Sequence, residues 1–308
     1  MFASVMLLFS LFSFGDTDQW SKTFSTDGSS QFRIVTSDAN IRVETWENSS
    51  IEARVTTRGW KIGDDGIKIY DRQSGDSVEI EIKFPRINFG FSNWNNRGVE
   101  IEVRVPKSTR LDLRTGDGNV DVRGVHDDIK LHSGDGNIRI ENVEGRLDAH
   151  TGDGNIEIRG SKGDITLETG DGRIELDSAD GTLKADTGDG PVRVRGRFDV
   201  LDLKTGDGRI EAEAVAGSRM TSDWTLQTGD GSLSLRLPED FSAEVDIHTS
   251  DGNIDLDMPV AVAGRTNNRT VRGKLGSGGA LLTMKTGDGS IKLMKTSRTA
   301  TSSHGANR

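Results

Sequence analysis

Aspartates are the residues whose spacing could most directly carry chemistry in this chain. The tetrapeptide TGDG, or its variant SGDG, recurs with an 18-residue period and holds an aspartate between two glycines. The aspartates of this series are Asp117, Asp135, Asp153, Asp171, Asp189 and Asp207. If the repeats stack, neighbouring carboxylates repel each other by roughly 1 kcal/mol in water. Some favourable interaction must therefore offset a uniformly negative row.

Two interpretations of this aspartate row follow. In the first, each carboxylate accepts hydrogen bonds from its own turn, as Asx turns do between glycines that permit positive φ. In the second, the row binds cations such as Ca²⁺, for which carboxylate oxygens are suitable ligands. Calcium-binding β-rolls carry a nonapeptide that places the aspartate differently and occurs twice per coil. We therefore adopt the first interpretation and expect no cofactor, with calcium at the aspartate row as the alternative.

Two histidines share the spacing of the aspartates. His132 and His150 are separated by one full repeat, so they should stack on the outer surface if the repeats are in register. A pair of imidazoles could bind Zn²⁺ or Cu²⁺, but two ligands make a weak site. We expect ordinary surface histidines at both positions.

Motifs that indicate catalysis are missing from the sequence. It contains no cysteine, no HExxH, no nucleophile elbow and no phosphate-binding loop. General acid–base catalysis needs two groups in different environments, and no carboxylate pair stands apart from the repeat. We therefore expect no catalytic residue and no enzymatic activity.

An aromatic segment is the best candidate for binding. Phe89, Phe91 and Trp94 lie in RINFGFSNWNNRG at 86–98, which interrupts the strand pattern. Exposed aromatic side chains would form a patch that binds a glycan or a partner protein. The alternative is a cap whose aromatic residues pack onto the first coil of the fold.

Short β-strands are the elements that must position these residues. Apolar residues alternate before each TGDG turn, as at Ile129 and Leu131, and again after it, as at Ile138 and Ile140. Alternation with a period of two indicates strands with one buried face and one solvated face. Two strands and two glycine-containing corners in each repeat predict an all-β fold, a parallel β-solenoid of stacked TGDG coils with irregular terminal coils.

Outward-facing charges support the stacking. From one repeat to the next the charge alternates in sign along Arg123, Glu141, Arg159, Asp177, Arg195 and Glu213. Opposite charges on neighbouring strands stabilise a sheet, whereas like charges destabilise it. An antiparallel meander would not pair residues at one fixed offset, so this row favours parallel coils in register.

The repeat also suggests how the chain is divided. The apolar run at 2–14 is too short for a relaxed membrane span and resembles a signal peptide cleaved before Asp16. The expected segments are a signal peptide at 1–15, irregular N-terminal coils and cap at 16–110, regular 18-residue repeats at 111–213, irregular C-terminal coils at 214–295 and a disordered tail at 296–308.

Composition limits the partners. The net charge of −10 opposes binding to nucleic acid or to an anionic membrane surface. The mature chain would contain no transmembrane segment and would lie outside the cytoplasm, in the periplasm, on the cell surface or in the medium. A cell-envelope polymer or protein is the partner that we expect.

A family resemblance agrees with this interpretation. The apolar leader, the degenerate N-terminal strands, the string VRVPKSTRLDLRTGDGNVDV at 103–122 and the TGDG turns after it resemble the bacterial putative-adhesin domain family. The resemblance covers roughly residues 30–295 and implies an exported β-solenoid, without implying a catalytic residue. The function expected from it is a non-catalytic adhesin-like or scaffold protein. The alternatives are an envelope-stress or regulatory component that acts through protein contacts and, third, a polysaccharide-active β-helix enzyme.

Overall fold

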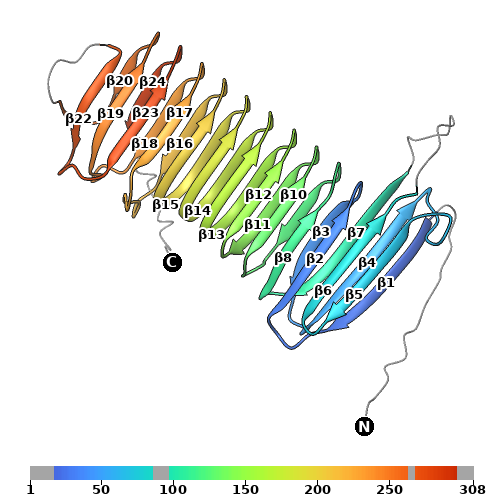
Figure 1. Cartoon of the computed structure of the whole chain (residues 1–308). Helices are drawn as coiled ribbons and strands as arrows, with labels where there is room; N and C mark the ends of the chain where they lie inside the picture. Colours follow the sequence, from blue (N-terminus) through green and yellow to red (C-terminus); the bar gives the residue numbers. More distant parts are fainter. Residues whose placement is uncertain (1–16, 86–96, 263–267, 297–308) are drawn as a thin grey trace, which may run out of the picture. The chain divides into compact units, whose positions relative to one another are not determined.

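Strands are the only regular elements in the described part of the chain. The computed structural model describes residues 17–85, 97–262 and 268–296 (Figure 1). The chain forms two compact units, Met1–Glu175 and Leu176–Arg308. The expectation of an all-β, solenoid-like fold is confirmed.

The first unit contains thirteen strands. They are β1 (Thr17–Ser25), β2 (Ser30–Thr36), β3 (Asn40–Trp46), β4 (Ser50–Arg58), β5 (Lys68–Ser74), β6 (Ser77–Lys83), β7 (Gly98–Pro106), β8 (Thr109–Arg114), β9 (Val120–Arg123), β10 (Ile129–Ser133), β11 (Ile138–Glu144), β12 (Leu147–Thr151) and β13 (Ile156–Thr169).

The second unit holds the remaining strands. They are β14 (Ile174–Thr187), which begins just before the boundary, β15 (Val192–Thr205), β16 (Ile210–Ala214), β17 (Trp224–Thr228), β18 (Leu233–Leu237), β19 (Ala243–Thr249), β20 (Ile254–Leu256), β21 (Val260–Val262), β22 (Thr270–Leu275), β23 (Leu281–Thr286) and β24 (Ile291–Lys295).

Apolar alternation produces the strands and their core. In β10 the side chains alternate between buried and exposed, and the same pattern occurs in β12. These two strands are parallel, with Ile129 opposite Leu147, and β11 pairs with β13 in the same way, with Ile138 opposite Ile156. Each partner is therefore one full repeat further along the chain. Burying one Ile or Leu side chain contributes roughly 1.5–3 kcal/mol, so the inward rows supply most of the stabilisation.

Buried hydroxyl groups join one TGDG turn to the next. In the second unit the Thr205 Oγ1 donates to the carbonyl oxygen of Gly190 at 2.9 Å and accepts from the Gly208 N–H at 3.1 Å. Ser133 makes the same two bonds in the first unit, to Gly118 and from Gly136. The first residue of every TGDG turn is buried. We call this series of buried hydroxyls the hydroxyl ladder.

The second glycine of the turn is fixed by close packing between coils. An ideal Cβ on Gly136 would lie 2.0 Å from the carbonyl oxygen of Gly118, and one on Gly154 would lie equally close to that of Gly136. Backbone atoms cannot move aside as a flexible side chain can. Any larger residue at this position would therefore separate the coils.

The first coil of the chain is not the outermost one. Strand β2 lies between β6 and β8, with Ile34 opposite both Ile80 and Leu113. Strand β3 lies in the same way between β7 and β9 (Figure 1). The coils of the first unit are therefore stacked in an order that differs from their order in the sequence.

Antiparallel strands cover the edge beyond this inserted coil. Strand β4 is antiparallel to both β1 and β7, and β5 is antiparallel to β6. Lys22 on β1 forms an ion pair with Asp71 on β5, and the ammonium lies 5.1 Å from the ring centroid of Phe24. Charged residues of this kind hinder the addition of a foreign strand to an open sheet edge.

The last coil of the second unit is inserted as well. Strand β23 lies between β17 and β19, with Leu282 opposite both Trp224 and Val245. Strand β24 likewise pairs with β18 and β20. Beyond them, β22 runs antiparallel to β19 and β21.

We predict that the hydroxyl ladder is necessary for stability. Thr205→Val keeps the shape of the side chain but leaves a buried carbonyl and a buried N–H unpaired, so unfolding should become easier by about 1–3 kcal/mol. Chemical denaturation followed by circular dichroism measures this difference. Thr205→Ser, which retains the hydroxyl as Ser133 does, is the control. Equal stability of the Val and Ser variants would contradict the assignment.

Candidate functional site

The aspartate row lies on the outer edge of the turns. Asp117, Asp135 and Asp153 are exposed, and the hydrogen bond expected for them is made by another residue. An Asx turn at Asp135 would use the N–H of Asn137, and that N–H donates to Asn119 Oδ1 at 2.9 Å. The N–H of Gly136 donates to Ser133 Oγ at 3.0 Å. In the described ranges no hydrogen bond holds any of these three carboxylates. The expectation of Asx turns is therefore wrong, because an asparagine oxygen of the neighbouring coil accepts the N–H that each carboxylate would need.

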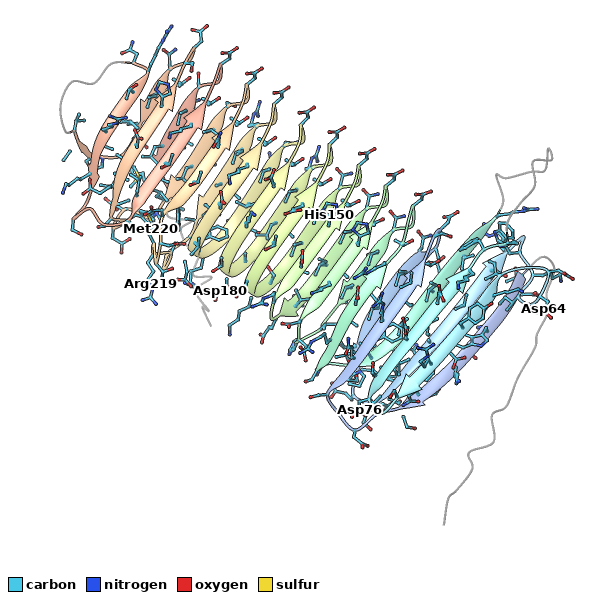
Figure 2. The ribbon with its side chains drawn as sticks, viewed as in Figure 1. Asp64, Asp76, His150, Asp180, Arg219 and Met220 are labelled. Carbon is cyan, nitrogen blue, oxygen red and sulfur yellow. The ribbon has the colours of Figure 1, made fainter. Side chains whose placement is uncertain are left out.

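The structure brings no metal-binding set together. Among the residues described, no group of three or more His, Asp or Glu side chains could hold a metal ion. His132 and His150 do stack, with parallel rings whose centroids are 5.1 Å apart. The Nδ1 of His150 lies 3.4 Å from the carboxylate of Glu168 on β13. These three side chains form a row on the outer surface, and Figure 2 labels its middle member, His150.

The surroundings of His132 change its acidity. Partial burial lowers the pKa of His132 from its ordinary value, and the positive charges of His150 and Arg114 act in the same direction. Lys130 and Asp148 are the other charged residues on the outer face of β10 and β12. Protonation of His132 is therefore disfavoured in the folded chain.

The aromatic candidates Phe89, Phe91 and Trp94 lie outside the described residues. Next to this segment, Trp60 and Phe84 make an edge-to-face contact with ring centroids 5.9 Å apart. Binding by the three aromatic residues stays a prediction.

A groove lined by asparagines is a feature that the sequence analysis missed. Asn119, Asn137 and Asn155 each follow a TGDG turn and are exposed, one coil apart. The Nδ2 of Asn137 donates to Asn119 Oδ1 at 3.2 Å, and the Nδ2 of Asn155 donates to Asn137 Oδ1 at 3.0 Å. The Oδ1 atoms also accept the backbone N–H of the next asparagine, at 2.9 Å in both cases.

The asparagine groove has a volume of about 410 Å³ and crosses three coils. Its other polar lining residues are Asp121, Arg139 and Glu157. The Arg139 guanidinium forms an ion pair with Glu157 at 3.1 Å, and their hydrogen bond raises the pKa of Arg139 further. The only signal in the sequence was the Asn that repeats after GDG.

Ion pairs between coils confirm several of the charges expected to meet one repeat apart. Arg123 contacts Glu141 at 3.4 Å in the first unit, and Arg195 contacts Glu213 at 3.4 Å in the second. Arg159 instead pairs with Glu157 on its own strand. Such exposed pairs contribute little to stability individually.

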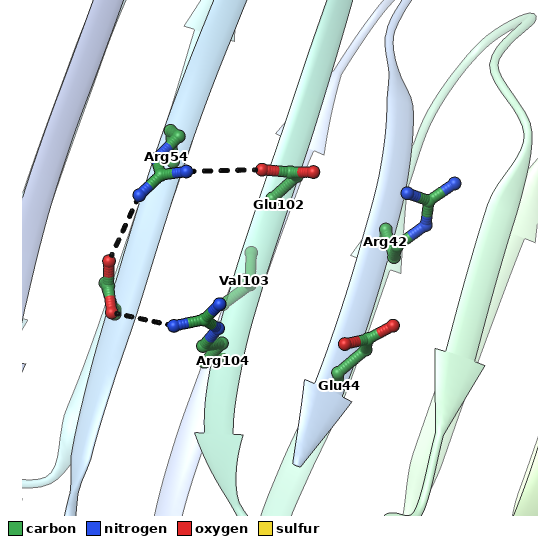
Figure 3. A pocket seen from close by; sticks show the side chains of 7 residues that line it. Arg42, Glu44, Arg54, Glu102, Val103 and Arg104 are labelled. Carbon is green, nitrogen blue, oxygen red and sulfur yellow. Dashed lines mark ion pairs between the residues drawn. The ribbon is translucent and has the colours of Figure 1, made fainter. Parts of the chain in front are cut away.

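A second hollow on the first unit is lined almost entirely by paired charges. It has a volume of about 70 Å³ and lies over β3, β4 and β7 (Figure 3). Arg54 contacts both Glu52 and Glu102 at 3.7 Å, and Arg104 contacts Glu52 at 3.8 Å. Each carboxylate is balanced by a guanidinium, so the hollow offers no isolated acid or base.

Another charged cluster marks a corner of the second unit. The Arg197 guanidinium contacts Asp199 at 2.8 Å and also pairs with Asp180. The hydrogen bond from Arg197 lowers the pKa of Asp199, although burial opposes this. The indole N–H of buried Trp224 donates to the Asp199 carbonyl at 3.2 Å, which fixes the 214–224 insertion to the core. The cluster therefore has a structural role at this corner.

Comparison with known protein families identifies the family of this chain. The family model described as Toastrack DUF4097 matches residues 30–294, which is most of the chain. The chain belongs to this family. Solved structures described as putative adhesins or cell adhesion proteins are similar to it. The expected resemblance to a putative-adhesin domain family of unknown molecular function is confirmed.

The similar solved structures are distant. A putative adhesin from Bacteroides fragilis is 11% identical, with 90% of this chain and 97% of that chain covered and a TM-score of 0.39. A putative cell adhesion protein from Clostridium sporogenes is 11% identical, with 91% and 100% covered and a TM-score of 0.29. A putative lipid binding protein from Parabacteroides distasonis is also 11% identical, with 91% and 97% covered and a TM-score of 0.30. With such low sequence identities and TM-scores, these structures do not support any conclusion about the function of this Toastrack chain.

Two further comparisons limit what can be assigned. No curated protein matches the sequence. Within the ranges that the structure describes, no helix has the length and apolar character needed to cross a membrane.

We predict that removing one charge from the aspartate row stabilises the fold. Asp153→Asn relieves repulsion from Asp135 and Asp171 and breaks no hydrogen bond, so the free energy of unfolding should rise by at most about 1 kcal/mol, less at high salt. Asp153→Ala should raise the free energy of unfolding by a similar amount. Thermal melts with calcium and with EDTA test this. A calcium-dependent rise in wild type that is lost in the Asn variant would favour the cation interpretation instead.

We also predict a pH dependence that originates at His132. Its folded pKa is depressed, so the unfolded chain binds more protons, and stability falls as the pH drops below the ordinary histidine pKa of about 6.5. His132→Gln should weaken this loss between pH 7 and pH 5, as measured by denaturant midpoints. His248→Gln, at a site whose ring contacts Thr270, is the control. An unchanged pH profile in His132→Gln would refute the prediction.

Proposed function

We propose that this Toastrack protein is a non-catalytic, exported, adhesin-like protein whose outer surface binds a polymer or protein of the cell envelope. In this proposal the 18-residue TGDG coil is the repeating unit of residues 111–213. The apolar segment at 2–14 acts as the export signal, and the mature chain works outside the cytoplasm.

The asparagine groove is the observation that carries the proposal. Three identical side chains at equal intervals suit a ligand that is itself repetitive, such as a polymer, better than a single small molecule. The described hollows are shallow features of the outer surface, because apolar side chains fill the interior. Most of the charges around them are paired, which gives no support to acid–base catalysis.

Co-sedimentation with envelope fractions tests the proposal. The full chain is incubated with purified cell-wall glycan, with membrane vesicles and with envelope proteins immobilised on beads. We expect saturable binding to at least one fraction, competed by the same material in soluble form. Assays for reducing ends and for released peptide should detect no product after prolonged incubation.

Two outcomes would contradict the proposal. The first is the absence of saturable binding to every envelope fraction. The second is the release of soluble fragments at a rate that depends on protein concentration, because this would indicate an enzyme.

A further inference from the structure

The hydrogen bonds of the asparagine groove leave a defined set of donors unused. A primary amide carries two N–H donors and one carbonyl acceptor. Asn119, Asn137 and Asn155 each donate one Nδ2 hydrogen to the asparagine of the preceding coil, beginning with Asn40. The second hydrogen of each has no protein partner in the described ranges. The groove therefore presents a row of unused amide donors at solvent-exposed positions.

The spacing of these donors is fixed by the fold. The three asparagines stand one coil apart, and neighbouring parallel strands are about 4.8 Å apart. The row ends at Arg173, whose backbone N–H donates to Asn155 Oδ1 at 2.9 Å but whose side chain does not continue the amide series. The donors thus form a short line along the direction in which the coils stack.

Charge restricts what can lie on this line. The exposed aspartates 117, 135 and 153 each stand two residues before an asparagine, and Asp121 adds another carboxylate to the wall. Arg139 is the one cation lining the groove, and Glu157 already neutralises it. An anionic polymer would be repelled, whereas a neutral polymer rich in hydrogen-bond acceptors would not.

We propose that the asparagine groove binds a neutral, linear polysaccharide of N-acetylhexosamine units, aligned with the coil stack. This inference rests on the proposed function and names its ligand class. An extended β-linked chain repeats at nearly the spacing of stacked strands. Because successive sugars turn over, every second acetamido carbonyl accepts an asparagine N–H, and ring hydroxyls occupy the positions between them.

The test uses the β-1,4-linked hexamer of N-acetylglucosamine as the probe and the full chain as the receptor. Heteronuclear NMR follows the side-chain amide signals, and calorimetry gives the affinity. We expect saturable shifts of the Asn119, Asn137 and Asn155 side-chain amides. The glucose hexamer, which lacks acetamido groups, should bind at least about tenfold more weakly, since a lost hydrogen bond accounts for roughly such a factor.

A pair of matched variants locates the binding. Asn137→Asp removes both donors of the central asparagine and should lower the affinity for the acetylated hexamer at least about tenfold. Asp148→Asn makes the reverse exchange on β12 and should leave the affinity unchanged. The NMR shifts in wild type test the site independently of any loss of stability in Asn137→Asp.

Specific outcomes would overturn the inference. Binding of the hexamer without shifts at the groove amides would place the site elsewhere. Equal affinity for the glucose hexamer would show that the acetamido groups do not contribute to binding, and this would refute the proposed contact with the asparagine amides. Absence of hexamer binding together with retained envelope co-sedimentation would refute the groove ligand and leave the proposed function standing, whereas loss of both would refute both.

Discussion

The hydroxyl ladder is the interaction on which the rest of the structure depends. A buried Thr or Ser at the start of a turn donates to a carbonyl of the adjacent coil, which belongs to Ala39 for Thr115 and to a glycine for Ser133 and Thr205. In most turns the hydroxyl also accepts an N–H of its own turn. Buried backbone groups without partners are costly, so these hydroxyls make a tight glycine turn compatible with close stacking. Glycine then permits the short distance between backbones, and the coils remain in register.

The regular spacing of the buried residues from coil to coil imposes the same regular spacing on the side chains of the outer surface. Because each coil repeats the position of the one before, Arg123 meets Glu141, His132 meets His150 and Asn137 meets Asn119. The same constraint brings the unpaired aspartates together along one edge. The surface is thus a set of parallel rows of side chains, and the asparagine row combines a groove with unused amide donors.

The sequence predicted the strands, their inward residues and the constant offset between partners because these depend on local alternation and a strict period. It did not predict which group caps the turn, since Thr and Asp in TGDG are both suitable and only burial distinguishes them. It also missed the asparagine groove. An Asn after GDG is common in turns, and only the structure shows that the side-chain amides of successive asparagines are hydrogen-bonded to each other. The stacking order near either end depends on pairings between distant segments, as between Ile34 and Leu113, which no local pattern encodes.

The inserted terminal coils make the protein indivisible in a way that ordinary repeat proteins are not. A solenoid stacked in chain order can lose a repeat from its end and keep the rest, because each repeat contacts only its neighbours. Here, removal of β23 and β24 would leave a gap between β17 and β19, and loss of β2 would separate β6 from β8. Proteolytic trimming from the C-terminal side would therefore open the stack as soon as it reached β24 and β23. On the N-terminal side, β1 pairs only with β4 among the described strands, so it could be removed before the internal strand β2 is reached.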